Sequence, residues 1–255
     1  TQQETLFPYT TLFRSRLVRS PWLGGSAAAL AVVLWALVPL LVDRAGELPP
    51  LRLSALALLA GAFGTLPMAR GGRHRARLSG PHGVMIHVGV PLLVAGAVGA
   101  CFTSFALAPP AEAALITYTW PVLFLLASRW LAQGNLPLAT LGGALLAFSG
   151  AALLVAPQVL AGAWGGYGLA LVAALCWALY SLACQVPGWR LGERMPHLLL
   201  TASVMTGMAS LLLEGVSELP SPWALLTTAA LGLGPYGIAM LAWDRAMRDP
   251  QAQRV

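Results

Sequence analysis

Eight long apolar stretches, separated by short polar segments, constrain this chain more than any other feature of its sequence. A helix needs about 20 apolar residues to cross the hydrocarbon core of a bilayer. Charged residues make up only 9% of the chain and hydrophobic residues 58%, which excludes soluble globular and disordered classes. The sequence therefore predicts an all-α polytopic membrane protein, with spans at 22–42, 51–68, 84–107, 111–131, 136–156, 167–186, 198–213 and 223–243.

The arginines indicate how these spans are oriented. The chain has fifteen arginines and no lysine. If the N-terminus is cytoplasmic, twelve arginines in and beside the loops lie inside and only Arg44 and Arg52 lie outside. Cytoplasmic loops of membrane proteins carry such an excess. We therefore expect a multi-pass protein of the bacterial inner membrane with a cytoplasmic N-terminus, whose surroundings are the lipid bilayer and which binds no nucleic acid.

The first residues have a different origin. Thr5–Ser15 is the translation of a common sequencing-adapter oligonucleotide. We therefore interpret residues 1–15 as a non-native, adapter-derived segment and exclude them from the prediction of the fold. The alternative is a short amphipathic N-terminal arm.

Two pairs of similar segments indicate an internal repeat. Leu34–Leu37 in the first span matches Cys176–Leu179 in the sixth, and a Gly-Gly pair precedes each. Phe105–Ala108 in the third span matches Trp243–Ala246 in the eighth. A repeat unit of five spans is odd in number, so its second copy enters the membrane in the opposite orientation, as in many secondary transporters. Chance similarity between helices rich in alanine and leucine is the alternative.

This unit defines the predicted domains. Residues 16–160 form a first repeat of five transmembrane helices, and residues 161–255 form a second repeat with only three. Two complete units would have ten helices, so we expect an inverted five-helix repeat transporter fold of which about eight helices are present and whose second repeat is incomplete.

The segment Ala108–Pro121 is the best candidate for a substrate pathway. It is a double-proline bend followed by an apolar helix in which Tyr118 and Trp120 stand beside Thr117. Pro121 cannot donate a backbone hydrogen bond, so we expect it to break the helix. In a bilayer such a break is tolerated where a neighbour or a cavity satisfies the freed carbonyl, which favours a lined space over a lipid-facing surface. The alternative is a simple packing kink.

Two acidic residues are candidates for binding or gating. Glu112 stands at the mouth of the aromatic helix, where a carboxylate could capture a substrate amine or act in gating, although an acid in the first turn of a helix is favourable without any function. Asp244 and Arg245 could gate the inner mouth, or they could form a solvated interface. The sequence shows no paired carboxylates, nucleophile–histidine set or metal-ligand spacing. We therefore expect no enzymatic activity, no catalytic residue, no metal and no cofactor.

Two motifs resemble a known family. The pattern Ala-Pro-Pro-x-Glu-Ala-x-Leu-Ile-x-Tyr-x-Trp-Pro at 108–121 and the run at 242–247 are similar to the drug/metabolite transporter superfamily of the EamA type, whose members are ten-helix inverted-repeat carriers. Within it the first motif resembles the branch that exports aromatic amino acids. Thr117 and Thr119 depart from this branch, which often has asparagine and leucine there.

The resemblance implies a function and a site. It implies a secondary transporter that exports small amphiphiles, aromatic amino acids above all, by alternating access. The alternatives are export of other metabolites or drugs and a non-transporting membrane scaffold. A planar substrate would stack on aromatic rings in a cavity at the interface of the two repeats. The residues expected to line this cavity are Trp35, Thr117, Tyr118, Trp120, Trp177 and Tyr180.

Overall fold

The computed structural model describes residues 22–69, 80–159, 162–186, 188–216 and 219–248. The segment interpreted as adapter-derived, residues 1–15, lies outside these ranges. Every regular element in the described residues is a helix. The elements are α1 (Trp22–Ala36), α2 (Val38–Arg44), α3 (Pro50–Ala69), α4 (Pro81–Val84), the π-helical η2 (Met85–Gly89), α5 (Val90–Leu107), α6 (Pro110–Thr117), α7 (Trp120–Gln133), α8 (Leu138–Val159), α9 (Trp164–Gln185), α10 (Leu191–Leu213), α11 (Pro222–Leu231), the π-helical η3 (Gly232–Ile238) and α12 (Ala239–Met247).

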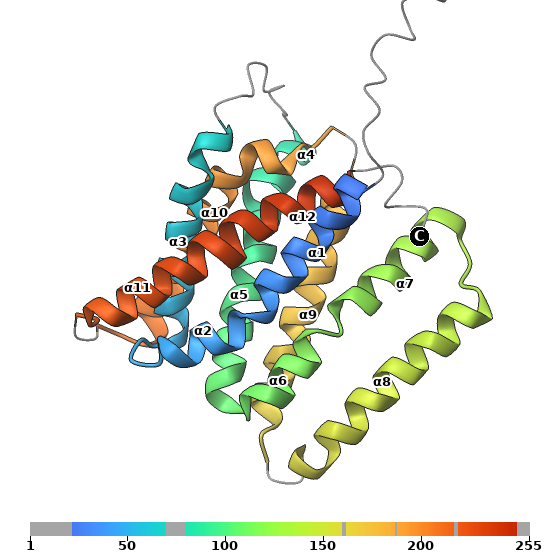
Figure 1. The fold of residues 1–255 in the computed structure, drawn as a ribbon, viewed down its shortest axis with the longest axis horizontal. Helices are drawn as coiled ribbons and strands as arrows, with labels where there is room; N and C mark the ends of the chain where they lie inside the picture. The colour runs from blue at the N-terminus through green and yellow to red at the C-terminus, as the bar shows by residue number, and fades with distance from the viewer. Residues whose placement is uncertain (1–21, 70–79, 160–161, 187, 217–218, 249–255) are drawn as a thin grey trace, which may run out of the picture.

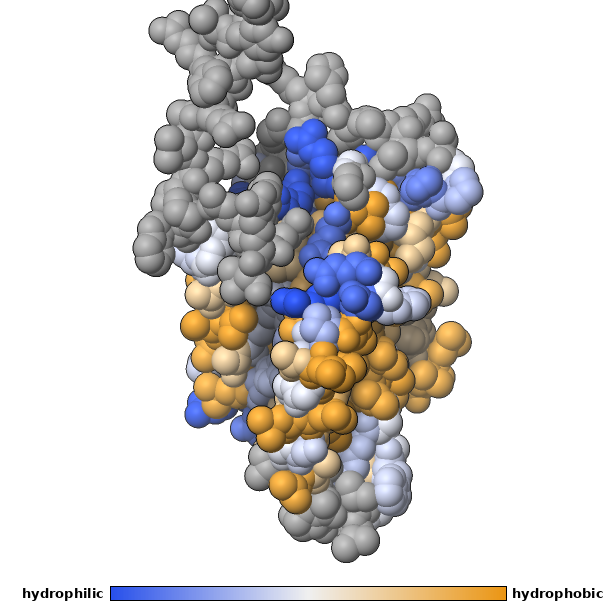
Figure 2. Space-filling view, turned by 90° about the vertical axis from the view of Figure 1, so that its right-hand side faces the viewer, coloured by the Kyte–Doolittle hydropathy of each residue, from blue (hydrophilic) through white to orange (hydrophobic). Residues whose placement is uncertain are grey.

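The helices match the predicted spans in number and order. Seven helical stretches in the described residues are long and apolar enough to cross a membrane. The remaining span corresponds to α8, which has 22 residues and a shorter apolar stretch at Leu138–Gly150. Large hydrophobic side chains such as Leu146 and Leu212 are exposed, and Figure 2 shows hydrophobic residues covering much of one face of the bundle. The prediction of an all-α polytopic membrane protein is confirmed.

Two predicted boundaries are wrong. The seventh span was expected to be short and to begin near Leu198, whereas α10 begins at Leu191 and has 23 residues. Glu193 lies in its first turn, where an acidic residue is favourable, and Pro196 removes a single backbone hydrogen bond from the helix. The fifth and sixth spans, predicted at 136–156 and 167–186, also extend toward each other, because α8 continues to Val159 and α9 begins at Trp164.

Prolines account for the interruptions in two spans. The first span breaks at Leu37, between α1 and α2, and Pro39 follows two residues later. The fourth breaks at Tyr118 and Thr119, between α6 and α7, and Pro121 follows. A proline leaves the carbonyl four residues before it without a donor. The expected break at Pro121 is therefore present, and it begins on the N-terminal side of the proline.

The two most extensive helix contacts in the bundle are α3 with α10 and α5 with α9, and those of α3 with η3 and of α1 with α12 follow. Segment η3 packs against α3, where Gly61 and Gly232 bring the two backbones together. A Cβ atom added at Gly232 would overlap the Ala57 carbonyl oxygen and lie 3.0 Å from the Gly61 nitrogen. In contrast α8 lies at the edge of the bundle (Figure 1) and makes its main contacts with α7 and α6.

Gly232→Ala tests the close approach of η3 to α3. Because the added methyl group would meet backbone atoms of α3, we expect a loss of about 1–3 kcal/mol in the free energy of unfolding. Thermal unfolding in detergent would measure it. The control is Gly168→Ala on α9, where a Cβ would have no atom within 4 Å and alanine is the better helix former. Equal stability of the two variants would contradict the proposed close packing.

A carboxylate joins the ends of α3 and α10. Glu214 follows the last residue of α10 and accepts hydrogen bonds from the backbone nitrogens of Leu51 at 2.7 Å and Arg52 at 3.1 Å. It also accepts from the Ser210 hydroxyl at 2.7 Å. These nitrogens lie in the first turn of α3, where backbone N–H groups have no partner within the helix. Glu214 therefore caps α3 from a helix that is distant in the sequence.

Glu214→Gln should lower stability by about 1–2 kcal/mol, because one charged acceptor of two backbone donors is replaced by a neutral amide. Chemical or thermal unfolding in detergent would show the loss. Glu47→Gln is the matched control, since Glu47 is exposed and accepts a single bond from the Ser221 nitrogen at 3.4 Å. If the two substitutions cost the same, the cap on α3 contributes nothing beyond a surface contact.

Candidate functional site

Four tryptophans from four helices meet in the interior of the bundle. Trp35 of α1 lies 5.6 Å from Trp120 of α7, 5.6 Å from Trp177 of α9 and 5.5 Å from Trp243 of α12, measured between ring centroids. Trp120 and Trp243 are 5.1 Å apart and nearly perpendicular. Each of the four side chains is at most 8% exposed. We call these four residues the tryptophan cluster.

Further aromatic residues extend the tryptophan cluster. Tyr236 of η3 stacks on Trp177 with an angle of 8° between the rings, and Tyr180 meets Trp177 edge to face at 5.7 Å. Phe124 lies 6.3 Å from Trp243. Such arrangements are the preferred ones for aromatic pairs. The interior where α1, α7, α9 and α12 meet is therefore aromatic almost throughout.

Hydrogen bonds at the edges of the rings fix their positions. Trp35 donates from Nε1 to the Pro235 carbonyl at 2.9 Å. The hydroxyl of Tyr118 donates to the Trp35 carbonyl at 2.8 Å, and that carbonyl is the one that Pro39 leaves without a backbone donor. A neighbouring side chain thus satisfies the group freed by a proline, as a helix break in a membrane requires.

A second bond joins α12 to α9. Trp243 donates from Nε1 to the Ser181 hydroxyl at 3.1 Å, and this hydroxyl donates to the Trp177 carbonyl at 2.9 Å. Trp35 and Trp243 therefore each satisfy their polar edge through a neighbouring helix while the faces of their rings remain in aromatic contact.

The structure brings together most of the residues predicted to line a cavity. Trp35, Trp120 and Trp177 converge as expected, and Tyr180 is fully buried beside them. The sequence predicted a shared hollow between the rings, whereas in this conformation the rings contact one another and fill that space.

The remaining predicted residues lie around the tryptophan cluster or away from it. Tyr118 is 38% exposed and reaches the cluster through its hydroxyl. Thr117 is buried, and its hydroxyl has no hydrogen-bond partner in the described part of the chain. Glu112 lies in the first turn of α6, next to Ala113, which packs with Tyr167 in a separate small cluster. Pro121 is exposed at the start of α7.

Sequence reasoning missed three residues of the site. Trp243 entered the comparison of repeats but was not predicted to line the cavity, and Tyr236 and Ser181 were not singled out. Their contacts depend on how the last span packs against α1 and α9, which no local sequence pattern reveals. The one signal for Trp243 was that it matches another aromatic residue, Phe105, in the comparison of the two repeats.

Two cavities open elsewhere on the bundle. One of about 210 Å³ lies between α3 and α10, and one of about 510 Å³ lies between α7 and α8. Arg194 and His197 line the first, and Arg129 and Thr140 line the second, among mostly apolar residues. Within the described ranges no three His, Cys, Asp or Glu side chains lie close enough to hold a metal ion.

The fold and the buried aromatic interior define a multi-pass membrane transporter, and comparison with known proteins gives its family. The EamA-like transporter family matches residues 22–156. The chain is 32% identical over 233 residues to the aromatic amino acid exporter YddG of Ancylobacter novellus, a match that covers 86% of this chain and 77% of that protein. The chain therefore belongs to the EamA-like transporter family, and it is a transporter and not an enzyme.

A solved structure shares the fold. A crystal structure superposes on this chain with a TM-score of 0.71 at 29% sequence identity, and the match covers 90% of this chain and 80% of the other. The arrangement of helices around the tryptophan cluster is thus one that has been observed experimentally in a related chain.

Trp35→Phe separates the hydrogen bond of this residue from its aromatic packing. The variant keeps a ring beside Trp120 and Trp177 but cannot donate to the Pro235 carbonyl, so we expect a loss of about 1–2 kcal/mol in stability. Thermal unfolding in detergent would measure it. Trp164→Phe is the control, because Trp164 is 66% exposed at the start of α9. An unchanged unfolding temperature for Trp35→Phe would show that the bond to Pro235 is dispensable.

Proposed function

We propose that this transporter exports small amphiphilic metabolites, aromatic amino acids above all, across the bacterial inner membrane by alternating access. The observation that carries the proposal is the tryptophan cluster, which joins α1, α7, α9 and α12 in the interior of the bundle. The name of the matched protein from Ancylobacter novellus, an aromatic amino acid exporter, supports the same substrate class.

The geometry of the rings suits a planar substrate. Aromatic pairs at these distances contribute about 0.5–1.5 kcal/mol beyond the burial of their area. When a substrate ring enters between Trp120 and Trp177, contacts between protein rings are lost. Contacts of the same kind between the protein rings and the substrate ring replace them. An aliphatic substrate of equal size would separate the rings without replacing their contacts. The tryptophan cluster therefore favours aromatic amphiphiles.

Polar groups near the rings can receive the polar part of a substrate. The buried Thr117 hydroxyl has no protein partner in the described ranges, and the Tyr118 hydroxyl next to it binds the Trp35 carbonyl. A buried hydroxyl without a partner is costly, so a substrate that bonds to Thr117 would gain from it. The lining that we propose consists of Trp35, Thr117, Tyr118, Trp120, Trp177 and Tyr180.

The helix breaks are the proposed hinges. Leu37 and the pair Tyr118–Thr119 interrupt the first and fourth spans, and the bond from the Tyr118 hydroxyl to the Trp35 carbonyl joins the two breaks. Broken helices at mid-membrane are typical of secondary transporters. Movement at one break is thereby passed to the other and changes the spacing of Trp35 and Trp120.

The pairing of helices supports the proposed inverted repeat, with units at 16–160 and 161–255. In such a repeat the first span corresponds to the sixth, the second to the seventh and the third to the eighth. The pair α1–α12 then corresponds to α9–α5, and α3–α10 lies on the symmetry axis. All three pairs are among the four most extensive in the bundle, which is compatible with this symmetry.

The distribution of arginines supports a cytoplasmic N-terminus. Arg44 ends α2 and Arg52 lies in the first turn of α3, at one end of the bundle. Arg190, Arg245 and Arg248 lie at the start of α10 and the end of α12, at the opposite end. The end with more arginines is expected to face the cytoplasm.

Tryptophan counterflow in proteoliposomes tests the proposal. The protein should exchange labelled tryptophan, and Trp177→Ala should lower the exchange at least about tenfold, because one of the two rings proposed to hold the substrate is lost. Trp130→Ala is the control, since Trp130 is 58% exposed at the end of α7. Gel filtration would confirm that both variants are folded. Exchange of other metabolites or drugs but not tryptophan would change the substrate class, and no exchange of any amphiphile would favour a scaffold.

A further inference from the structure

Asp244 of α12 is buried, contrary to one of the two interpretations of the sequence. As a solvated interface pair, Asp244 and Arg245 would both be exposed. Asp244 is instead 0% exposed and its ion-pair partner is Arg248, whereas Arg245 is exposed. A carboxylate in the interior of a membrane protein is expensive and is usually functional.

The two oxygens of Asp244 have different surroundings. Oδ2 accepts a hydrogen bond from Nη2 of Arg248. It also lies against the N-terminus of α10, where a Cβ atom added at Gly192 would overlap it. Oδ1 is buried and has no hydrogen-bond partner among the residues that the structure describes. One half of the carboxylate is therefore open to a further donor.

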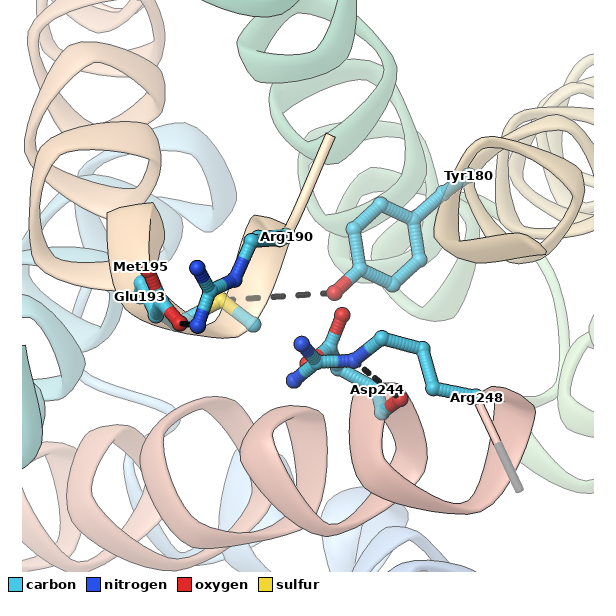
Figure 3. A network of polar contacts seen from close by, with 6 residues as sticks. All are labelled: Tyr180, Arg190, Glu193, Met195, Asp244 and Arg248. Carbon is cyan, nitrogen blue, oxygen red and sulfur yellow. Dashed lines mark hydrogen bonds and ion pairs between the residues drawn. The ribbon is translucent and has the colours of Figure 1, made fainter. Parts of the chain in front are cut away.

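This carboxylate adjoins the tryptophan cluster. Figure 3 shows the hydroxyl of Tyr180 directed toward Asp244 and Arg248 from α9, with Met195 of α10 beside it. The hydroxyl makes a weak contact with the Met195 sulfur at 4.0 Å and also lies beside the Cys184 thiol. Trp243, the residue before Asp244, bonds to Ser181, the residue after Tyr180. Tyr180 and Asp244 thus lie together, directly beside the tryptophan cluster.

Arg248 is placed so that it can leave the carboxylate. It follows Met247, the last residue of α12, and its side chain is 37% exposed. Its guanidinium also donates from Nε to the Asp244 carbonyl at 3.3 Å. Because the side chain is partly exposed at the end of the helix, it can swing away from both acceptors without movement of the helix. Lys and Arg side chains near helix ends commonly extend toward the aqueous interface in this way. The carboxylate would then lack a cation.

We propose that Asp244 binds the ammonium group of the transported amphiphile and that Arg248 occupies the carboxylate when no substrate is bound. This inference rests on the proposed function, because it requires an aromatic substrate with a primary amine. The ring of that substrate would lie among the tryptophans while its amine reached Oδ1 and the Tyr180 hydroxyl. With a cytoplasmic N-terminus this end of the bundle faces the cytoplasm, where an exported substrate enters.

Competition for bound tritiated tryptophan on the full chain in nanodiscs tests the inference. Tryptamine carries the ring and the amine, and indole-3-propionate carries the ring and a carboxylate. We expect tryptamine to compete at a concentration about tenfold or more below that of indole-3-propionate. Asp244→Asn keeps the shape and one acceptor oxygen but loses the charge. It should weaken tryptamine about tenfold, whereas indole-3-propionate, which no longer meets a like charge, should not weaken.

Arg248→Gln should act in the opposite direction. In this variant tryptamine no longer competes with the Arg248 guanidinium for the Asp244 carboxylate, so its apparent affinity should rise about threefold or more. If the ion pair between Asp244 and Arg248 is only structural, both Asp244→Asn and Arg248→Gln should instead weaken binding and lower the unfolding temperature. Arg245→Gln removes the same charge from an exposed position one residue away, and it should change tryptamine binding by less than about twofold.

The outcomes separate this inference from the proposed function. No binding of tryptophan to the unaltered protein would overturn both. Tryptophan binding with equal competition by tryptamine and indole-3-propionate would overturn the inference alone. If Asp244→Asn does not fold, competition by tryptamine and by indole-3-propionate, measured on the unaltered protein and on Arg248→Gln, still tests the inference. A preference for the amine that increases in Arg248→Gln supports the inference, and any other result overturns it.

Discussion

The centre of this bundle depends on one carbonyl that a proline has freed. Pro39 cannot supply the amide donor for the Trp35 carbonyl, and the Tyr118 hydroxyl supplies one at 2.8 Å. The indole of Trp35 in turn donates to the Pro235 carbonyl at 2.9 Å. In a bilayer an unsatisfied carbonyl costs several kcal/mol, so these bonds require α1, α6 and η3 to meet where they do. The tryptophan cluster forms at that meeting point.

Hydropathy alone predicts the eight helical segments, because each must satisfy its own backbone in the membrane. It cannot place their ends to within a turn where polar residues are themselves helical, as at Glu193 in α10. Nor can it show which side chains meet. Trp35, Trp120 and Trp177 could be predicted from a family resemblance, whereas Trp243 and Tyr236 reach them through the packing of the last span against α1 and α9.

Residues of the same or similar type have different roles according to their position in the bundle. Gly232 lies where η3 and α3 nearly touch, while Gly143 of α8 would have no atom within 4 Å of an added Cβ. Asp244 and Glu112 both lie near helix ends, yet only Asp244 adjoins the aromatic interior. The sequence presents each pair as equivalent, and the packing of neighbouring helices, which is not encoded locally, separates them.

The ring geometry also gives the molecule a spectroscopic property. Four of its nine tryptophans form one cluster, in which Trp35 contacts the other three rings and Trp120 contacts Trp243. Indole transitions at such separations couple, so the cluster will dominate the near-ultraviolet circular dichroism, and excitation will pass rapidly among its members. Any event that spreads these rings will alter that signal without an added dye, and it can therefore be followed by near-ultraviolet circular dichroism.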